Sequence, residues 1–221
     1  MNECKLVALT TPRVEGVNSA EEFIAYAARV SNPANQNNSE TAAKLVRYLM
    51  KNNHWSPFEM VSMTLEIRTT RDIARQILRH RSFSFQEFSQ RYAEATEFVT
   101  REARLQDTKN RQNSIEIRDD SRDIAIVQEW EQNQKNILEL VQLIYTNALK
   151  KGVAKEQARS ILPEGCTVST LYMAGTLRSW IHYCGLRMAN GTQKEHMEVA
   201  KSAWQIIEAE FPSIAEAVHG L

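Results

Sequence analysis

Residues 79–92 read Arg79-His80-Arg81-Ser82-Phe83-Ser84-Phe85-Gln86-Glu87-Phe88-Ser89-Gln90-Arg91-Tyr92. The stretch combines cationic side chains, a histidine, hydroxyls and a carboxylate, and it contains no glycine or proline. Such groups can neutralise a phosphate and hydrogen-bond the edge of a heterocycle. Arginines taken alone more often lie on a solvated face or pair with carboxylates, but the aromatic and polar residues that follow favour a structured binding loop. The stretch therefore points to an anionic, nucleotide-like ligand.

The composition indicates one globular domain without a strong charge. The chain has 221 residues, which suit a single domain over residues 1–221, and its 27 basic and 27 acidic side chains give a net charge of zero. A neutral chain does not favour general nucleic-acid binding. The three cysteines are far apart and lack partners at metal-ligand spacing, so neither a disulfide framework nor a metal site is expected. No stretch approaches membrane-spanning length, and we expect a cytoplasmic protein without a membrane partner.

The spacing of apolar residues predicts mostly helices with a few isolated strands, which is an α+β class. Strands are expected at residues 5–10, 61–67 and 167–173, and helices at 19–31, from 39, from 72 through His80, 124–152, around Glu156 and Arg159, 176–187 and 192–211. Ser19 and Ser39 are the expected N-caps, and Gly152 is the expected C-cap. The polar residues 101–122 predict a loop, and Pro212 predicts a break before a short tail.

Two further groups of residues carry possible chemistry. His54 precedes a rigid Pro turn, although a lone loop histidine is more often structural. Arg178 and His182 are four residues apart and can share one face of a helix. Arg187 lies near the end of that helix, where the macrodipole alone would favour a cation. Arg159, taken alone, indicates a surface ion pair.

The spacing of the first motif resembles that of a known family. Arg79-His80-Arg81, followed after seven residues by Ser89, is similar to the signature of the flavin-dependent thymidylate synthases. The resemblance extends over nearly the whole chain, through residues that fall in the family's order: Ser84, Glu87, Arg91 and Tyr92; His54 with Ser56-Pro57-Phe58-Glu59; Ala158-Arg159 with Leu162-Pro163; Arg178, Trp180 and His182; and Leu186-Arg187.

The resemblance implies a fold and an activity. The fold would be that of the thymidylate synthase complementing proteins, a mostly helical single domain with a small, largely antiparallel sheet. The activity would be de novo synthesis of dTMP by reductive methylation of dUMP, with methylenetetrahydrofolate as the carbon donor, NADPH as the reductant and FAD as the hydride relay. No cysteine nucleophile would be needed. The family forms homotetramers whose FAD sites lie between subunits, and the same assembly is implied here.

The resemblance also implies roles for individual residues. The expected dUMP contacts are Gln76, Arg79, Glu87, Ser89, Gln90, Arg91, Arg159 and Arg187. The expected FAD contacts are Ser56, Arg79, His80, Arg81, Glu87, Thr176, Leu177, Arg178 and His182. Arg187 would activate the uracil ring by stabilising the electron density that builds on it, and His54 is the second expected catalytic residue.

Some positions depart from the family's pattern. Gln86 stands where Asn is usual, Met60 and Gly191 stand where His is often found, and Thr176 stands where an Asn commonly contacts the flavin. These changes bear on flavin affinity more than on the reaction. The alternative is a binding protein, either a homologue that holds nucleotide or flavin without turnover or a nucleic-acid binder that uses residues 79–122, and the neutral charge argues against the second.

Overall fold

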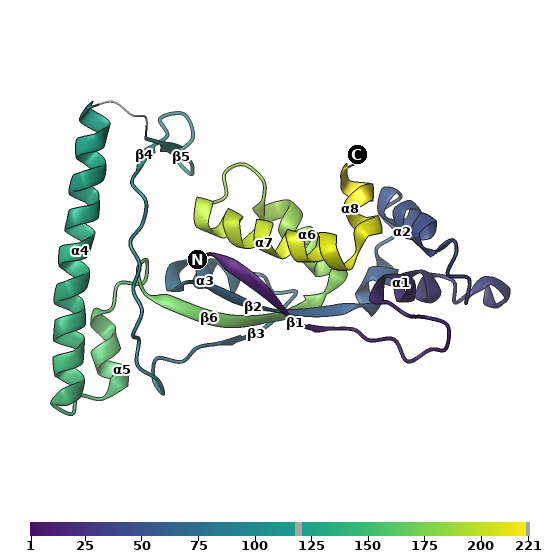
Figure 1. Cartoon of the computed structure of the whole chain (residues 1–221), viewed down its shortest axis with the longest axis horizontal. Coiled ribbons are helices and arrows are strands. Elements are labelled where there is room, and N and C mark those ends of the chain that lie inside the picture. The colour runs from purple at the N-terminus through teal and green to yellow at the C-terminus, as the bar shows by residue number, and fades with distance from the viewer. Residues whose placement is uncertain (118–120, 220–221) are drawn as a thin grey trace.

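The computed structural model describes residues 1–117 and 121–219 (Figure 1). Its strands are β1 (Glu3–Leu9), β2 (Ser62–Thr70), β3 (Ser84–Glu87), β4 (Arg104–Gln106), β5 (Ser114–Glu116) and β6 (Val168–Thr176). Its α-helices are α1 (Ala20–Ala28), α2 (Ala42–Lys51), α3 (Arg71–Ile77), α4 (Ser121–Lys150), α5 (Lys155–Ala158), α6 (Leu177–Arg187), α7 (Lys194–Glu210) and α8 (Pro212–His219). Short 3-10 helices are η1 (Pro33–Asn35), η2 (Ser56–Met60) and η3 (Arg159–Ile161). The expected α+β class, mostly helical with a small antiparallel sheet, is confirmed.

The central sheet has the strand order β1-β2-β6-β3, and all its neighbours are antiparallel. The longest pairing joins β2 to β6, from Ser62 opposite Thr176 to Thr70 opposite Val168. Side chains in β2 alternate as the sequence predicts, because Met63, Leu65 and Ile67 are buried while their neighbours are partly exposed. One face of the sheet therefore packs on the core.

Helices cover that face and extend the core (Figure 1). Helices α3, α6 and α7 pack on the sheet, and α7 also packs on both α3 and α6, whereas α1, α2 and α8 group at one end of the molecule. The largest fully buried side chains include Trp180 and Tyr183 of α6. The long helix α4 stands at the opposite end with α5, where Ala95, Tyr145, Ala158 and Leu162 form a second small apolar cluster.

Local signals at the helix ends explain several boundaries. Ser19 caps α1 by accepting a hydrogen bond from the backbone N–H of Glu22, and Thr176 caps α6 in the same way through Ser179. Gly152 has φ +84° just after α4, in the left-handed region that favours glycine. The predicted cap at Ser39 is wrong, because α2 begins after Thr41, which makes no side-chain cap bond.

Four other expectations are corrected. Helix α3 ends at Ile77, so His80 lies beyond the helix rather than on it. Residues 84–87 form strand β3 instead of a loop, because they pair with β6. The polar segment 101–122 contains the β4–β5 hairpin and the start of α4, while residues 118–120 lie outside the described part. Pro212 does end α7, but it also opens α8, since proline suits the first position of a helix.

No helix among residues 1–117 and 121–219 is long and apolar enough to cross a bilayer.

Gly175 in β6 provides a test of the packing between the sheet and residues 80–85. A Cβ at this position would lie 2.4 Å from Cδ1 of Phe83, whose ring packs 4.8 Å from that of Trp180. We expect Gly175→Ala to lower the free energy of unfolding by about 1–3 kcal/mol, because the crowded ring cannot move freely. Urea unfolding measures the change.

The control is Gly185→Ala, where a Cβ would meet nothing within 4 Å and the residue lies within helix α6. That substitution should be neutral or slightly stabilising, since alanine favours a helix more than glycine does. Equal effects of the two substitutions would contradict the close packing of Phe83 on Gly175.

Candidate functional site

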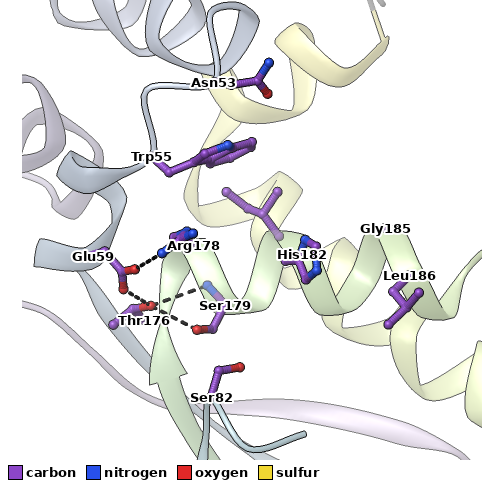
Figure 2. A pocket seen from close by; sticks show the side chains of 11 residues that line it. Asn53, Trp55, Glu59, Ser82, Thr176, Arg178, Ser179, His182, Gly185 and Leu186 are labelled. Atoms are coloured by element: carbon purple, nitrogen blue, oxygen red, sulfur yellow. Dashed lines mark hydrogen bonds and ion pairs between the residues drawn. The ribbon is translucent and has the colours of Figure 1, made fainter.

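A cavity of about 930 Å³ lies where η2 meets the first turns of α6 (Figure 2). The residues that line it come from the segment between α2 and η2, from η2, from the motif stretch, from the end of β6 and from α6: Asn53, Trp55, Glu59, Ser82, Thr176, Arg178, Ser179, Ile181, His182, Gly185 and Leu186. Arg178 and His182 lie one turn apart on the same face of α6, as the sequence predicts. The cavity thus contains three of the expected flavin contacts, including Thr176.

Glu59 holds the N-terminal end of α6 in place (Figure 2). One carboxylate oxygen accepts a 2.7 Å hydrogen bond from Oγ1 of Thr176, and the other accepts a 2.6 Å bond from Nη1 of Arg178. These bonds, first that of Arg178 and then that of Thr176, lower the pKa of the Glu59 carboxyl. The arrangement fixes a cation and a hydroxyl beside the indole of Trp55, and such a set suits a planar ligand that carries an anionic group.

A buried cluster of His80, Tyr183, His196 and Gln76 lies beside α6, with Arg187 at its edge. Nε of Arg187 donates a 2.9 Å hydrogen bond to Nε2 of His80, and the ring of His80 meets that of Tyr183 edge-on at 4.9 Å. Burial, and then the charge of Arg187, lower the pKa of His80 to about 4. His80 is therefore neutral at pH 7 and accepts from Arg187, whose Nη groups make no hydrogen bond within the described part of the chain.

Two members of this cluster, Tyr183 and His196, were missed by the sequence analysis. His196 is fully buried, and its ring nitrogens lie 3.2 Å from Oε1 of Gln76 and 3.1 Å from the hydroxyl of Tyr183. Burial, and then Arg187 and His80, lower the pKa of His196 to about 3. A signal was present in the sequence, since His196 falls on the face of α7 that buries Val199 and Ala203.

A second cavity, of about 370 Å³, lies beside the start of α3 and η3. Three arginines line it, Arg71, Arg75 and Arg159. The other lining residues are Gln90, Glu156, Ser160, Leu162 and Glu164. Nε2 of Gln90 is buried without a hydrogen-bond partner among residues 1–117 and 121–219, and the residue is only 3% exposed. A buried donor without a partner beside arginines suits an oxyanion. The expected nucleotide contacts Gln90 and Arg159 therefore meet here.

Three more expected nucleotide contacts, Glu87, Ser89 and Arg91, lie beside this second cavity. Glu87 accepts a 2.9 Å hydrogen bond from Oγ of Ser169 and pairs with Arg71 at 3.3 Å. Arg91 pairs with Glu156 at 3.5 Å, and the Ser89 hydroxyl accepts from the backbone N–H of Arg91 at 3.4 Å. The strand β3 thus carries the motif from the buried cluster to the second cavity.

Five expected site residues lie outside both cavities and the buried cluster. His54 is exposed, with its ring edge-on to that of Tyr48 at 5.9 Å, and Ser56 is an exposed residue at the start of η2. Arg79 and Arg81 are exposed, and neither guanidinium makes a hydrogen bond or ion pair with residues 1–117 or 121–219. Leu177 is fully buried in the core.

Comparison with known proteins identifies the family. The family model described as thymidylate synthase complementing protein matches residues 13–213. The chain belongs to this family. It is 52% identical over 216 residues to a probable flavin-dependent thymidylate synthase of Paramecium bursaria Chlorella virus 1, with 97% of each chain covered. It is 50% identical over 220 residues to the flavin-dependent thymidylate synthase of Synechocystis sp., with 98% of this chain and 99% of that protein covered.

A solved structure shares the fold. The UMP/dUMP methylase PolB from Streptomyces cacaoi, bound with 5-Br dUMP, superposes with a TM-score of 0.80 at 27% identity, covering 99% of this chain and 94% of that one. Together with the curated relatives, it confirms the prediction that the chain is an enzyme of the flavin-dependent thymidylate synthase family.

The two neutral histidines predict a pH dependence of stability in this family member. Their pKa values are about 4 for His80 and about 3 for His196 in the fold, against 6.5 ordinarily, so the unfolded chain binds more protons below pH 6.5. Stability is therefore full above that pH and falls as the pH drops. His196 alone should cost about 1.4 kcal/mol per pH unit between roughly pH 6 and 5, and the half-buried His80 should cost less.

Urea unfolding at fixed protein concentration over that range measures the slope. The range lies above the usual titration of carboxylates, so the histidines dominate it. His196→Leu should flatten the slope, whatever its effect on the stability itself. An unchanged slope in this variant would contradict a neutral His196.

Proposed function

We propose that this enzyme converts dUMP to dTMP with methylenetetrahydrofolate, NADPH and FAD. The overall reaction balances as dUMP, methylenetetrahydrofolate, NADPH and a proton giving dTMP, tetrahydrofolate and NADP⁺. The methylene carbon must gain a hydride to become a methyl group, and the folate leaves unoxidised, so the reductant supplies that hydride. The observation that carries the proposal is Arg187, a cation oriented by neutral His80 on a helix that also lines the large cavity.

The nucleotide would extend from the buried cluster to the second cavity. Its phosphate fits the cavity with Arg159 and the unpartnered Gln90, and Ser89 and Arg91 stand beside that cavity. Its base and sugar would then lie toward Gln76, Arg79, Glu87 and Arg187. Helix α3 connects the two places, because its Arg71 and Arg75 line the cavity while its Gln76 contacts the cluster.

The large cavity fits a flavin. Its volume of about 930 Å³ accommodates a large cofactor, its indole offers a planar surface, and Arg178 offers a fixed cation. His182 and Thr176 would contact the flavin directly, and the remaining expected flavin contacts are Ser56, Arg79, His80, Arg81, Glu87 and Leu177. A bound flavin would supply the hydride that the methyl group requires.

Arg187 would act on the pyrimidine. Its guanidinium keeps two Nη groups available while Nε is bonded to His80, so the charge can face the ring in a set orientation. A fixed cation there stabilises the electron density that makes C5 nucleophilic, and a preoriented charge does so without reorganisation. His80 serves this purpose as a neutral acceptor, since a protonated imidazole would repel the guanidinium.

The cysteines fit a reaction that uses no thiolate. Burial raises the pKa of the Cys4 thiol to about 12 and raises that of Cys184 as well. Burial also raises the pKa of Cys166. Thiols with raised pKa values are poor nucleophiles at neutral pH, which supports a route through Arg187 rather than through a covalent enzyme intermediate.

The exposed arginines of the motif support an assembly. Arg79 and Arg81 point to no partner within the described chain, which fits a homotetramer whose flavin sites draw on a second copy. His54, an exposed residue between the lining residues Asn53 and Trp55, would then face the flavin and the folate entry. The proposal also includes a single domain over residues 1–221 and a cytoplasmic location. It includes no nucleic-acid or membrane partner.

Purified protein tests the proposed reaction directly. It should bind FAD, be yellow, and form dTMP from dUMP when NADPH and methylenetetrahydrofolate are supplied. The visible spectrum and product chromatography measure both properties. A colourless protein that stays inactive with added FAD would refute the reaction, whereas flavin binding without dTMP would leave only the binding-protein alternative.

Arg187→Ala tests the activating charge. Because the transition-state charge would lose its stabilisation, kcat should fall about 100- to 1,000-fold while the melting temperature changes little. Arg47→Ala, which removes a surface pair with Glu216, is the matched control and should keep normal turnover. Near-normal turnover in the Arg187 variant would remove this residue from the mechanism.

A further inference from the structure

A chain of hydrogen bonds links three helical segments behind the candidate nucleotide site. His196 of α7 contacts Oε1 of Gln76 at 3.2 Å through Nδ1 and the hydroxyl of Tyr183 at 3.1 Å through Nε2. Nε2 of Gln76 in turn donates a 2.7 Å bond to Oε1 of Gln193. The imidazole is fully buried, so no solvent competes for these contacts.

The chemistry of the partners sets the direction of every bond in this chain. A carboxamide oxygen only accepts, so the imidazole must carry its proton on Nδ1 to bond Oε1 of Gln76. Nε2 of the neutral ring is then an acceptor, and the Tyr183 hydroxyl must donate to it. The low pKa of His196 agrees with a ring that holds one proton.

Two contacts hold the orientation of the Gln76 carboxamide. Because its oxygen faces His196, the carboxamide turns its NH₂ group away from the buried imidazole and toward Gln193. Without the Nδ1 proton, only the bond to Gln193, whose own amide donates to the Glu195 carboxylate, would still distinguish the oxygen from the nitrogen of the Gln76 amide. With that single contact the side chain is held less firmly and can rotate to present an acceptor where a ligand oxygen requires a donor.

We propose that His196 is a positioning residue that, with Tyr183, holds the Gln76 carboxamide so that its N–H group faces an acceptor oxygen of the bound nucleotide. The inference rests on the proposed function, in which Gln76 contacts dUMP. His196 touches no ligand itself and acts through Gln76. Tyr183 contributes by donating to Nε2, which reserves Nδ1 as the protonated nitrogen.

A pair of amide variants separates orientation from packing. In His196→Asn the side-chain amide lies near the position of Nδ1 and can donate to Gln76, whereas in His196→Gln it lies near the position of Nε2 and cannot. We expect the Asn variant to bind dUMP within about three-fold of the wild type and the Gln variant about ten-fold more weakly. Both substitutions introduce a polar amide, so their melting temperatures show whether folding differs. Equal affinities of the two variants would overturn the proposal.

A double-mutant cycle tests whether the effect passes through Gln76. His196→Leu should weaken dUMP binding about ten-fold in the wild type and have no further effect in a Gln76→Met background. The same loss in both backgrounds would overturn the proposal, because a purely structural role does not depend on the amide. Titration calorimetry with dUMP measures each step.

The dUMP titration of the wild-type protein distinguishes a failure of the positioning role from a failure of the proposed function. Wild-type protein that binds no dUMP refutes the proposed function and the positioning role with it. Wild-type protein that binds dUMP, together with an additive cycle, refutes the positioning role alone and leaves the proposed function standing.

Discussion

The antiparallel pairing of β2 with β6 determines the rest of this structure. The two strands run in opposite directions from Ser62–Thr176 to Thr70–Val168, and each continues directly into a helix. Helix α3 therefore starts at one end of the ladder and α6 at the other, and their carboxyl ends meet over the sheet. That meeting brings His80 and Arg187 to 2.9 Å. A slip of one residue in the pairing would turn the buried side chains outward and separate the two ends.

The same strand pairing explains why the candidate site has three parts. The large cavity forms at the end where α6 begins, beside Thr176, and the arginine-lined cavity forms at the other end, beside Arg71. A strand rises about 3.4 Å per residue, so these two ends are roughly 27 Å apart. The cluster around Arg187 lies between them. Such a separation suits two ligands whose reactive groups meet at the centre better than one ligand that fills both cavities.

Local patterns in the sequence predict the elements but not all of their contacts. The alternation in β2 and the cap at Ser19 depend on neighbouring residues, so they were predicted correctly. Strand β3 has only four residues, and its pairing with a distant strand decides its structure. The contacts of His196 with Gln76 and Tyr183 exist only because α7 packs on α3 and α6. Sequence spacing gives no direct account of such long-range contacts.

In the proposed function, Arg187, set in place by neutral His80, stands between a nucleotide and a flavin. A crystal structure of the enzyme with FAD and dUMP tests it most directly. We expect the pyrimidine beside Gln76 and Arg187, the phosphate in the cavity with Gln90 and Arg159, and the flavin in the cavity beside Arg178. A nucleotide bound away from Arg187, or a flavin in the arginine-lined cavity, would contradict it.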